Sequence, residues 1–406
     1  MRPGTRDVFG RLAADGGAPV REKFLPVALP TVGEAEKQAV IETLESGWMT
    51  TGPKAIELGK RIAAHSGAAH GLAVNSATGA LHLALLAWGV GPGDEVITST
   101  WTFASTANVV LHTGATVVLV DVDPKTLNLD PARVEAAITP RTKAIIAVDF
   151  GGHPADYAAL RPLCDRHGLR LLADAAHSFG ARFDDRPVGT LADATAFSFY
   201  AIKNITTGEG GCLVTDDLPF LERAQVLSLH GISKDAWKRY SSAGSWYYEV
   251  TVPGFKYNLT DLAAAIGLAQ LHRWVEFDAK RAEVAARYDA GFAGVPEVAR
   301  PYADPRVHHA RHLYTLRLDL PSLTVDRGRF LELLKAENIG TTVNFIPVHK
   351  HPYYRDALGF RPADFPVAER VYPAIFTLPL YPRMSDADVD DVVTAVRKVL
   401  HHTRVS

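Results

Sequence analysis

The chain has 406 residues, of which 47% are hydrophobic and 22% charged, and its formal net charge is −2. This length exceeds that of a common single domain, so we expect a large domain and a smaller one. The balanced charge contains no long basic or acidic run, which excludes an electrostatic basis for binding nucleic acid or a membrane surface.

Strands and helices alternate over the first half of the chain, after two amphipathic helices predicted between residues 33 and 67. Short apolar runs predict buried strands at 70–74, 95–98, 115–120, 143–149, 169–174, 195–200 and 212–215. Helices are predicted between them at 78–88, 105–112, 131–138 and 157–167. Buried strands separated by helices indicate parallel crossover connections, and therefore an α/β layered sheet.

The pattern changes after about residue 251. The expected elements are helices at 259–277 and 278–292, a strand at 313–318, a helix at 327–337, a strand near 342–345 and terminal helices ending around 401. We predict an N-terminal extension over 1–30, with disorder as one expectation for it. A large α/β domain over 31–255 and a small α+β domain over 256–406 complete the predicted division.

The sequence shows neither a targeting signal nor a metal-ligand pattern. The N-terminal residues contain no apolar core of a signal peptide, and no run of about 18 apolar residues predicts a membrane span. Cys164 and Cys212 are the only two cysteines and form no metal-ligand pattern. We therefore expect a cytoplasmic protein without a metal site.

The segment FSFYAIKNITTGEGG (197–211) places Lys203 five residues after Ser198, between an apolar strand and a Gly-rich turn. A lone lysine is most often a solvated surface charge. At the edge of a sheet, however, loss of solvation favours the neutral amine, which is the nucleophile that forms a Schiff base. Ser198 has a suitable spacing to hold a phosphate oxygen.

The segment LLADAAHSFGA (171–181) places Asp174 at the end of a predicted strand. One interpretation is a helix N-cap. The other is a carboxylate that pairs with a protonated pyridine nitrogen and so makes the ring an electron sink. Ligands of α/β folds bind at the carboxyl ends of strands, which favours the second. His177 would then lie beside the ring, although a structural histidine fits equally well.

Two further segments supply an anion cradle and an aromatic face. In NSATGALHLALLA (75–87) a strand turns into a helix whose first amides, near Thr78 and Gly79, are suited to a phosphate, unless the segment is an ordinary Ser/Thr cap. Phe103 precedes the next helix and is our candidate for stacking on a flat ring, although aromatic residues are mostly core. The possible phosphate site, the aromatic residue, the acid and the lysine all follow predicted strands. Together they indicate a site for pyridoxal phosphate.

The runs NSATGA, DAAHSFGA, AIKNIT followed by EGG, and GFKYNLTD resemble motifs of the DegT/StrS-type nucleotide-sugar aminotransferases, which use pyridoxal phosphate. The resemblance extends from GWMTTGP (47–53) to the C-terminus and is strongest to the enzymes that form UDP-4-amino-4-deoxy-L-arabinose. It implies the aspartate-aminotransferase fold type I, with a mainly parallel seven-stranded sheet and a smaller C-terminal domain. Ala77 departs from the glycine of many relatives. Some relatives carry histidine instead of Lys203 and catalyse dehydration.

The resemblance also implies the residues that bind the cofactor. They are Thr78, Gly79, Phe103, Asp174, Ser198, Lys203 and Asn258. Lys203 would carry pyridoxal phosphate as a Schiff base, with Asp174 and His177 as its catalytic partners. Asn258 would reach the phosphate of the neighbouring subunit, so the active sites would be composite and the protein a homodimer.

The implied reaction is a transamination in two halves. L-Glutamate or L-glutamine would convert the cofactor to pyridoxamine phosphate, which would then aminate a nucleotide-linked 4-keto sugar. The sugar nucleotide would be bound by Thr51, His230, Tyr314 and His349, with Trp48, Lys238, Arg239 and Tyr240 nearby. Each of these residues is almost as well explained as a loop or core residue.

Other outcomes on the same scaffold remain open at this stage. They are amination of a 3-keto sugar or of a cyclitol, dehydration, and a non-catalytic regulator. A regulator would be expected to lack the lysine or the acid, and this chain has both Lys203 and Asp174. The sequence alone identifies neither the sugar nor the nucleotide.

Overall fold

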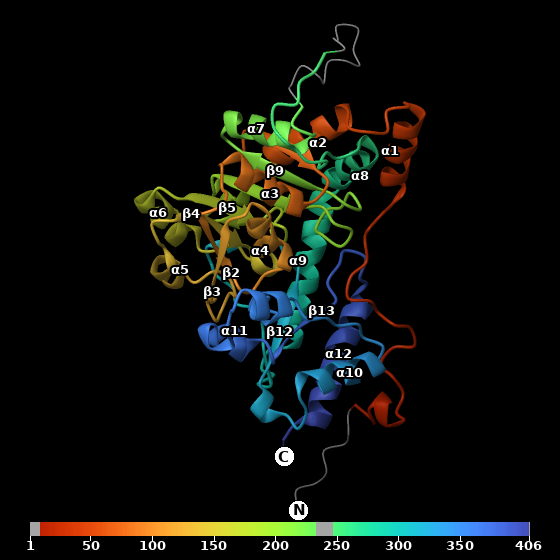
Figure 1. Cartoon of the computed structure of the whole chain (residues 1–406). Coiled ribbons are helices and arrows are strands. Elements are labelled where there is room, and N and C mark those ends of the chain that lie inside the picture. Colours follow the sequence, from red (N-terminus) through yellow and green to blue (C-terminus); the bar gives the residue numbers. More distant parts are fainter. Residues whose placement is uncertain (1–8, 233–246, 406) are drawn as a thin grey trace, which may run out of the picture.

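A seven-stranded sheet forms the centre of the large domain in the computed structural model, which describes residues 9–232 and 247–405 (Figure 1). The strands are β1 (His70–Val74), β2 (Glu95–Ser99), β3 (Thr116–Val120), β4 (Thr142–Val148), β5 (Arg170–Asp174), β8 (Ala194–Ser198) and β9 (Gly211–Thr215). Their spatial order is β1-β9-β8-β5-β4-β2-β3. Only β9 runs antiparallel to its neighbours. The carboxyl ends of the other six strands therefore meet at one edge.

Helices cover both faces of this sheet, so its strands are apolar on both sides. These helices are α2 (Pro53–Ser66), α3 (Ala77–Ala87), α4 (Ala104–His112), α5 (Pro131–Ala137), α6 (Tyr157–His167), α7 (Leu218–Ser228) and α8 (Asp261–His272). Asp130, Asp156 and Asp217 each accept a hydrogen bond from a first-turn amide and so begin α5, α6 and α7.

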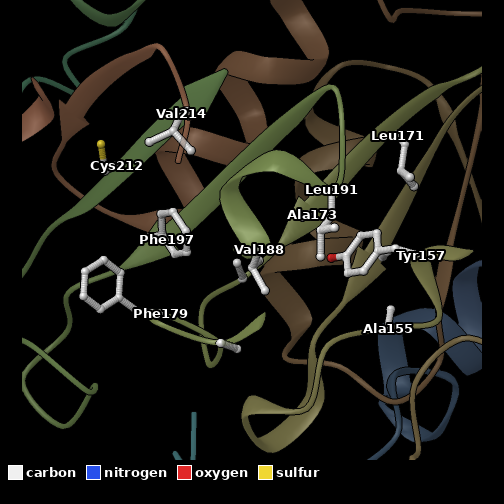
Figure 2. Close-up of a cluster of buried hydrophobic side chains, with 14 of the residues drawn as sticks. Ala155, Tyr157, Leu171, Ala173, Phe179, Val188, Leu191, Phe197, Cys212 and Val214 are labelled. Carbon is white, nitrogen blue, oxygen red and sulfur yellow. The ribbon is translucent and has the colours of Figure 1, made fainter. Parts of the chain in front are cut away.

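The two faces of the sheet belong to two separate apolar clusters. Figure 2 shows part of one cluster, in which Leu171 and Ala173 of β5 lie near Tyr157 of α6. The intervening residue, Leu172, belongs to the cluster on the opposite face. This alternation follows from the two-residue repeat of a strand.

The small domain contains a second sheet, made of β10 (Val298–Ala299), β12 (Tyr314–Leu318) and β13 (Ile375–Leu378). Its helices are α9 (Trp274–Gly291), α10 (Arg327–Ala336), α11 (Pro366–Val371) and α12 (Asp386–Thr403). The long helix α9 runs from the large domain into the small one (Figure 1).

Two expectations for this half of the chain were wrong. Residues 342–345 form no strand: Thr342 makes an isolated bridge to Thr377, and Asn344 and Phe345 line a cavity instead. The strand that completes the small sheet is β13, which the sequence did not single out. The break between the two long helices falls at Arg273, not at 277–278.

The first described residues pack against the small domain before the chain enters α1 (Glu34–Glu45). Leu12 and Leu25 are buried in its apolar core, and the amide of Gly340 donates to the carbonyl of Leu25 at 2.8 Å. At the other predicted boundary, α8 packs against α1 and α2. The division at 30/31 and 255/256 stays a prediction. In the described ranges, no helix has the length and apolar character needed to cross a membrane.

Candidate active site

A cavity of about 400 Å³ lies at the carboxyl edge of the large sheet, closed on one side by the small domain. It is the point at which six of the residues singled out from the sequence meet. They are Thr78, Phe103, Asp174, His177, Ser198 and Lys203. They come from the ends of β5 and β8, the starts of α3 and α4, and the loop between β8 and β9.

The start of α3 faces this cavity with free amides. Ser76 caps the helix, because its Oγ accepts a hydrogen bond from the amide of Gly79 at 3.0 Å. The amides of Ala77 and Thr78 donate to no acceptor within the described part of the chain. Gly79 itself does not line the cavity, and its amide is already used by the cap. The free amides suited to an anion are therefore those of the two residues before Gly79.

Gly211, the first residue of β9, allows the strand to lie directly against this helix start. A Cβ atom at Gly211 would lie 2.6 Å from the amide nitrogen of Ala77 and 2.7 Å from the carbonyl oxygen of Phe197. The pairing of Ser198 with Gly211 brings the serine hydroxyl to the same place. A close backbone approach thus gathers the groups suited to hold a phosphate.

Asp174 ends β5 and has one firm hydrogen bond. Its Oδ2 accepts from the hydroxyl of Thr106 at 2.7 Å, and its Oδ1 accepts from the amide of Ala176 at 3.2 Å. Burial raises the pKa of this carboxyl group, although both hydrogen bonds oppose the shift. No helix begins after Asp174, so the N-cap interpretation is wrong. The carboxyl group faces the cavity instead.

Lys203 projects into the same cavity from the loop that joins β8 to β9. Removal from bulk water lowers its pKa from 10.5 to about 8, and the nearby Asp174 carboxylate opposes this shift. At pH 7 roughly a tenth of the side chains would be neutral. A lysine of lowered pKa at this position is suited to the nucleophilic role that the sequence predicts for it.

Two buried histidines form the wall beside Lys203. Nδ1 of His177 accepts a hydrogen bond from the amide of Gly151 at 3.2 Å, and its ring centroid lies 4.3 Å from that of His312. Nδ1 of His312 lies 3.0 Å from Oδ1 of Asn204, which orients it as the donor. Burial lowers the pKa of both rings well below the usual value, and the Lys203 charge adds to this. Both histidines are therefore neutral at pH 7.

His312 and Asp149 line the cavity but were not singled out from the sequence. Asp149 follows β4, next to β5, so the strand-end argument used for Asp174 would have found it. Burial raises the pKa of Asp149 to about 7, against hydrogen bonds donated by Ser178, Ala155 and Tyr157. His312 precedes β12 and gave no signal of comparable strength.

Thr51 and Asn258 lie outside this cavity and contact each other. Nδ2 of Asn258 donates to Oγ1 of Thr51 at 2.5 Å, and this hydroxyl donates to the carbonyl of Leu259 at 2.6 Å. The segment around Asn258 is bridged to Val74, at the end of β1. The structure therefore holds the pair next to the helix start of α3, but not within the cavity of its own chain.

The other proposed substrate residues are not at the cavity. Tyr314 is buried and its hydroxyl donates to Oδ1 of Asp289 at 2.7 Å, while its predecessor Leu313 lines the cavity. His349 is fully buried, with ring nitrogens 2.6 Å from Oγ1 of Thr100 and 2.7 Å from Oε1 of Glu369. For Tyr314 and His349 the core interpretation holds.

His230 is exposed at the end of the described segment and does not line the cavity. Trp48 is also partly exposed, and its indole N–H donates to the carbonyl of Thr51. Lys238, Arg239 and Tyr240 lie outside the described residues.

The cavity fits pyridoxal phosphate in the chemistry of its groups. It combines free helix amides for a phosphate, a buried carboxyl group for a ring nitrogen and a lysine of lowered pKa. Phe103, which is 62% exposed, adds an aromatic ring. Among the described residues, no group of histidine, cysteine, aspartate or glutamate is arranged to hold a metal ion.

Comparison with known proteins agrees with this chemistry. The model of the DegT/DnrJ/EryC1/StrS aminotransferase family matches residues 30–397. The chain is 53% identical over 381 residues to the spore coat polysaccharide biosynthesis protein SpsC of Bacillus subtilis, covering 94% of this chain and 98% of SpsC.

Solved structures show the same fold and cofactor. The PMP form of Spr1654 from Streptococcus pneumoniae is 34% identical, with a TM-score of 0.88 over 93% of this chain and 99% of its own. Spr1654 has also been solved in its PLP form. DesI in the presence of its TDP-sugar product is 32% identical, with a TM-score of 0.85 over 96% of each chain. The chain therefore belongs to the DegT/DnrJ/EryC1/StrS aminotransferase family and is a pyridoxal-phosphate-dependent aminotransferase of fold type I.

Proposed function

We propose that this aminotransferase moves the amino group of L-glutamate or L-glutamine to the C4 ketone of a nucleotide-linked sugar. The observation that carries the proposal is the single cavity that joins Lys203, Asp174 and the start of α3. Membership of a sugar aminotransferase family supports a sugar acceptor. The TDP-sugar product of DesI supports a nucleotide carrier. The motifs AIKNIT, EGG and GFKYNLTD favour the subtype that forms UDP-4-amino-4-deoxy-L-arabinose.

In this proposal, the residues of the cavity divide the work of holding the cofactor. The amides of Ala77 and Thr78, with the Ser198 hydroxyl, bind the phosphate. The Asp174 carboxylate would pair with the ring nitrogen and keep it protonated, and the side chain of Phe103 would supply an aromatic contact for the ring. When bound, pyridoxal phosphate supplies an electron sink for the carbanion at the reacting carbon of the substrate.

Lys203 has two roles in the proposed reaction. Its neutral Nζ forms the covalent link to the cofactor at rest. With the donor bound, a free Nζ would remove and return the proton at the reacting carbon of the substrate. His177 and His312 are both neutral and therefore add no positive charge beside Nζ. The apolar residues of the wall, such as Leu313 and Phe345, limit the access of water.

The covalent link is tested with the purified protein and borohydride. We expect a visible absorbance band from bound pyridoxal phosphate, and reduction should fix the cofactor to the peptide that contains Lys203. Lys203→Ala should lose the band, whereas Lys60→Ala, at an exposed lysine of α2, should keep it. An unaltered band in Lys203→Ala would contradict the assignment of the lysine.

The acceptor is tested with glutamate or glutamine and a panel of 4-keto and 3-keto nucleotide sugars, with the products identified by NMR. Amination at C4 supports the proposal. Turnover only with 3-keto sugars would favour the 3-amination alternative and leave the family assignment intact. Turnover only with a cyclitol ketone or with free keto acids would exclude a nucleotide-sugar acceptor.

A further inference from the structure

A second cavity, of about 470 Å³, lies between the small domain and the loop that follows β3, and it shares no lining residue with the active-site cavity. Its lining contains four cationic side chains: Lys125, Arg300, Arg311 and Arg317. The remaining residues are Asp289, Pro301, Tyr302 and Ala303. Neither the family match nor the relatives assign a ligand to it. We call it the basic cavity.

The charges of the basic cavity are unbalanced. Its one carboxylate, Asp289, accepts a hydrogen bond from the Tyr314 hydroxyl, and the carbonyl of Asp289 accepts one from Arg300 at 3.0 Å. Within the described ranges, none of the four cations forms an ion pair. Four positive charges and one negative charge therefore face one small volume, although the whole protein carries a net charge of −2.

Two of the arginines that line the cavity are half-buried. Arg317 lies on β12 and is half-buried; its Nη1 donates to the carbonyl of Pro124 at 3.2 Å, which leaves its other N–H groups available. Arg311 is also half-buried and has a backbone φ of 51°. This left-handed conformation is uncommon for a residue other than glycine and persists only when its surroundings impose it.

The surroundings of Arg311 account for this conformation. Its backbone packs against Gly152, and its carbonyl accepts a hydrogen bond from Nη1 of the buried Arg281 at 3.3 Å. The next residue, His312, faces the active-site cavity, whereas the side chain of Arg311 faces the basic cavity. The fold thus holds one cationic side chain on the far side of the active-site wall.

We propose that the basic cavity binds a small molecule that carries a phosphate monoester or a diphosphate. Guanidinium groups offer paired N–H donors that match phosphate oxygens, and three of them around one volume suit an anion of charge −2 or more. The volume is within the range of small-ligand sites. At the rim, Nζ of Lys125 lies 5.6 Å from the ring centroid of Tyr302, so an aromatic face adjoins the charges. This inference does not depend on the identity of the sugar substrate.

The experiment is a calorimetric titration of the protein loaded with pyridoxal phosphate, using inorganic pyrophosphate as the probe and citrate as a carboxylate rival. Arg311→Gly removes the guanidinium and also permits the positive φ, so the backbone should be preserved. Arg300→Ala removes an exposed cation at the rim. Arg329→Ala, at an exposed arginine of α10, is the matched control.

We expect saturable pyrophosphate binding that weakens about tenfold or more in Arg311→Gly and in Arg300→Ala, and weakens as salt is added. Arg329→Ala should bind like the wild type. A wild type that does not bind millimolar pyrophosphate would overturn the proposal. Unaltered binding in both cavity variants, or tighter binding of citrate than of pyrophosphate, would overturn it as well.

Discussion

Asp149 and Asp174 are buried carboxyl groups at the ends of neighbouring strands, and they differ in how their oxygens are used. Both oxygens of Asp149 accept short hydrogen bonds, from Tyr157 and an amide on one side and from Ser178 on the other. In Asp174 only Oδ2 has a short contact, to Thr106. Asp149 therefore holds its own loop together, whereas Oδ1 of Asp174 retains capacity for a group in the cavity.

Asp174→Asn should keep the cofactor and lose most of the transamination. The amide cannot keep the ring nitrogen protonated as a carboxylate does, so the substrate carbanion is less stabilised. We expect a barrier higher by about 3 kcal/mol, which is roughly a hundredfold in rate. Single-turnover rates with glutamate measure this, with Asp193→Asn, a half-exposed acid away from the cavity, as the control. Near-normal rates in Asp174→Asn would remove the ring-nitrogen role.

For single residues, the sequence was sufficient to predict a position at the cavity where that position depends on the end of a strand. Asp174, Ser198 and Lys203 follow apolar strands, and parallel strands bring their carboxyl ends together whatever the details of packing. Tyr314 and His349 do not line the cavity, because the face of a strand or turn that points into a cavity depends on its tertiary neighbours. A single register step separates Tyr314 from Leu313, which does line the cavity.

The antiparallel strand β9 is the element that shapes the phosphate end of the cavity. It returns the chain from the Lys203 loop to β8, and Gly211 lets it approach the start of α3. The alternation of apolar runs predicted this strand, but not its direction. The same kind of pattern over 342–345 predicted a strand that is absent, because those residues turn towards the cavity instead of pairing.

Gly211→Ala should separate β9 from α3 and loosen the phosphate site. The added methyl group would lie 2.6 Å from backbone atoms of Ser76 and Ala77, which cannot rotate away. We expect a loss of about 1–3 kcal/mol in unfolding free energy and weaker retention of pyridoxal phosphate on dialysis. Gly91→Ala is the matched control, because its nearest neighbour would be 3.9 Å away. Equal stability and retention in both variants would contradict the close-approach argument.

Thr51 and Asn258 raise the question of whether one chain is a complete enzyme. The pair lies beside the end of β1 and the start of α3 but outside the cavity of its own chain. This position is compatible with the proposed contact of Asn258 with the phosphate of a neighbouring subunit. The proposal of a homodimer with composite sites rests on this placement and on the GFKYNLTD motif.

Mixing Lys203→Ala with Asn258→Ala should restore activity if subunits exchange. Each heterodimer would contain one intact composite site, so an equal mixture should reach roughly a quarter of the wild-type activity. Mixing Lys203→Ala with Asp174→Asn is the control. Both of those residues belong to the cavity of one chain, so no intact site can form. A wild-type protein that is fully active as a monomer in sizing and kinetic experiments would refute the composite site.

The position of β1 has a consequence for the order of folding during synthesis. This strand is completed at residue 74, but its partner in the sheet, β9, begins at residue 211. Ribosomes add about 5–20 residues per second, so the hydrogen-bonding edge of β1 stays unpaired for roughly seven to thirty seconds before its partner is synthesised. Closure of that long loop is slow in itself. While the residues between β1 and β9 are being made, about a third of the chain, the nascent protein carries an unpaired strand, and chaperones or misassembly would compete for it in this interval.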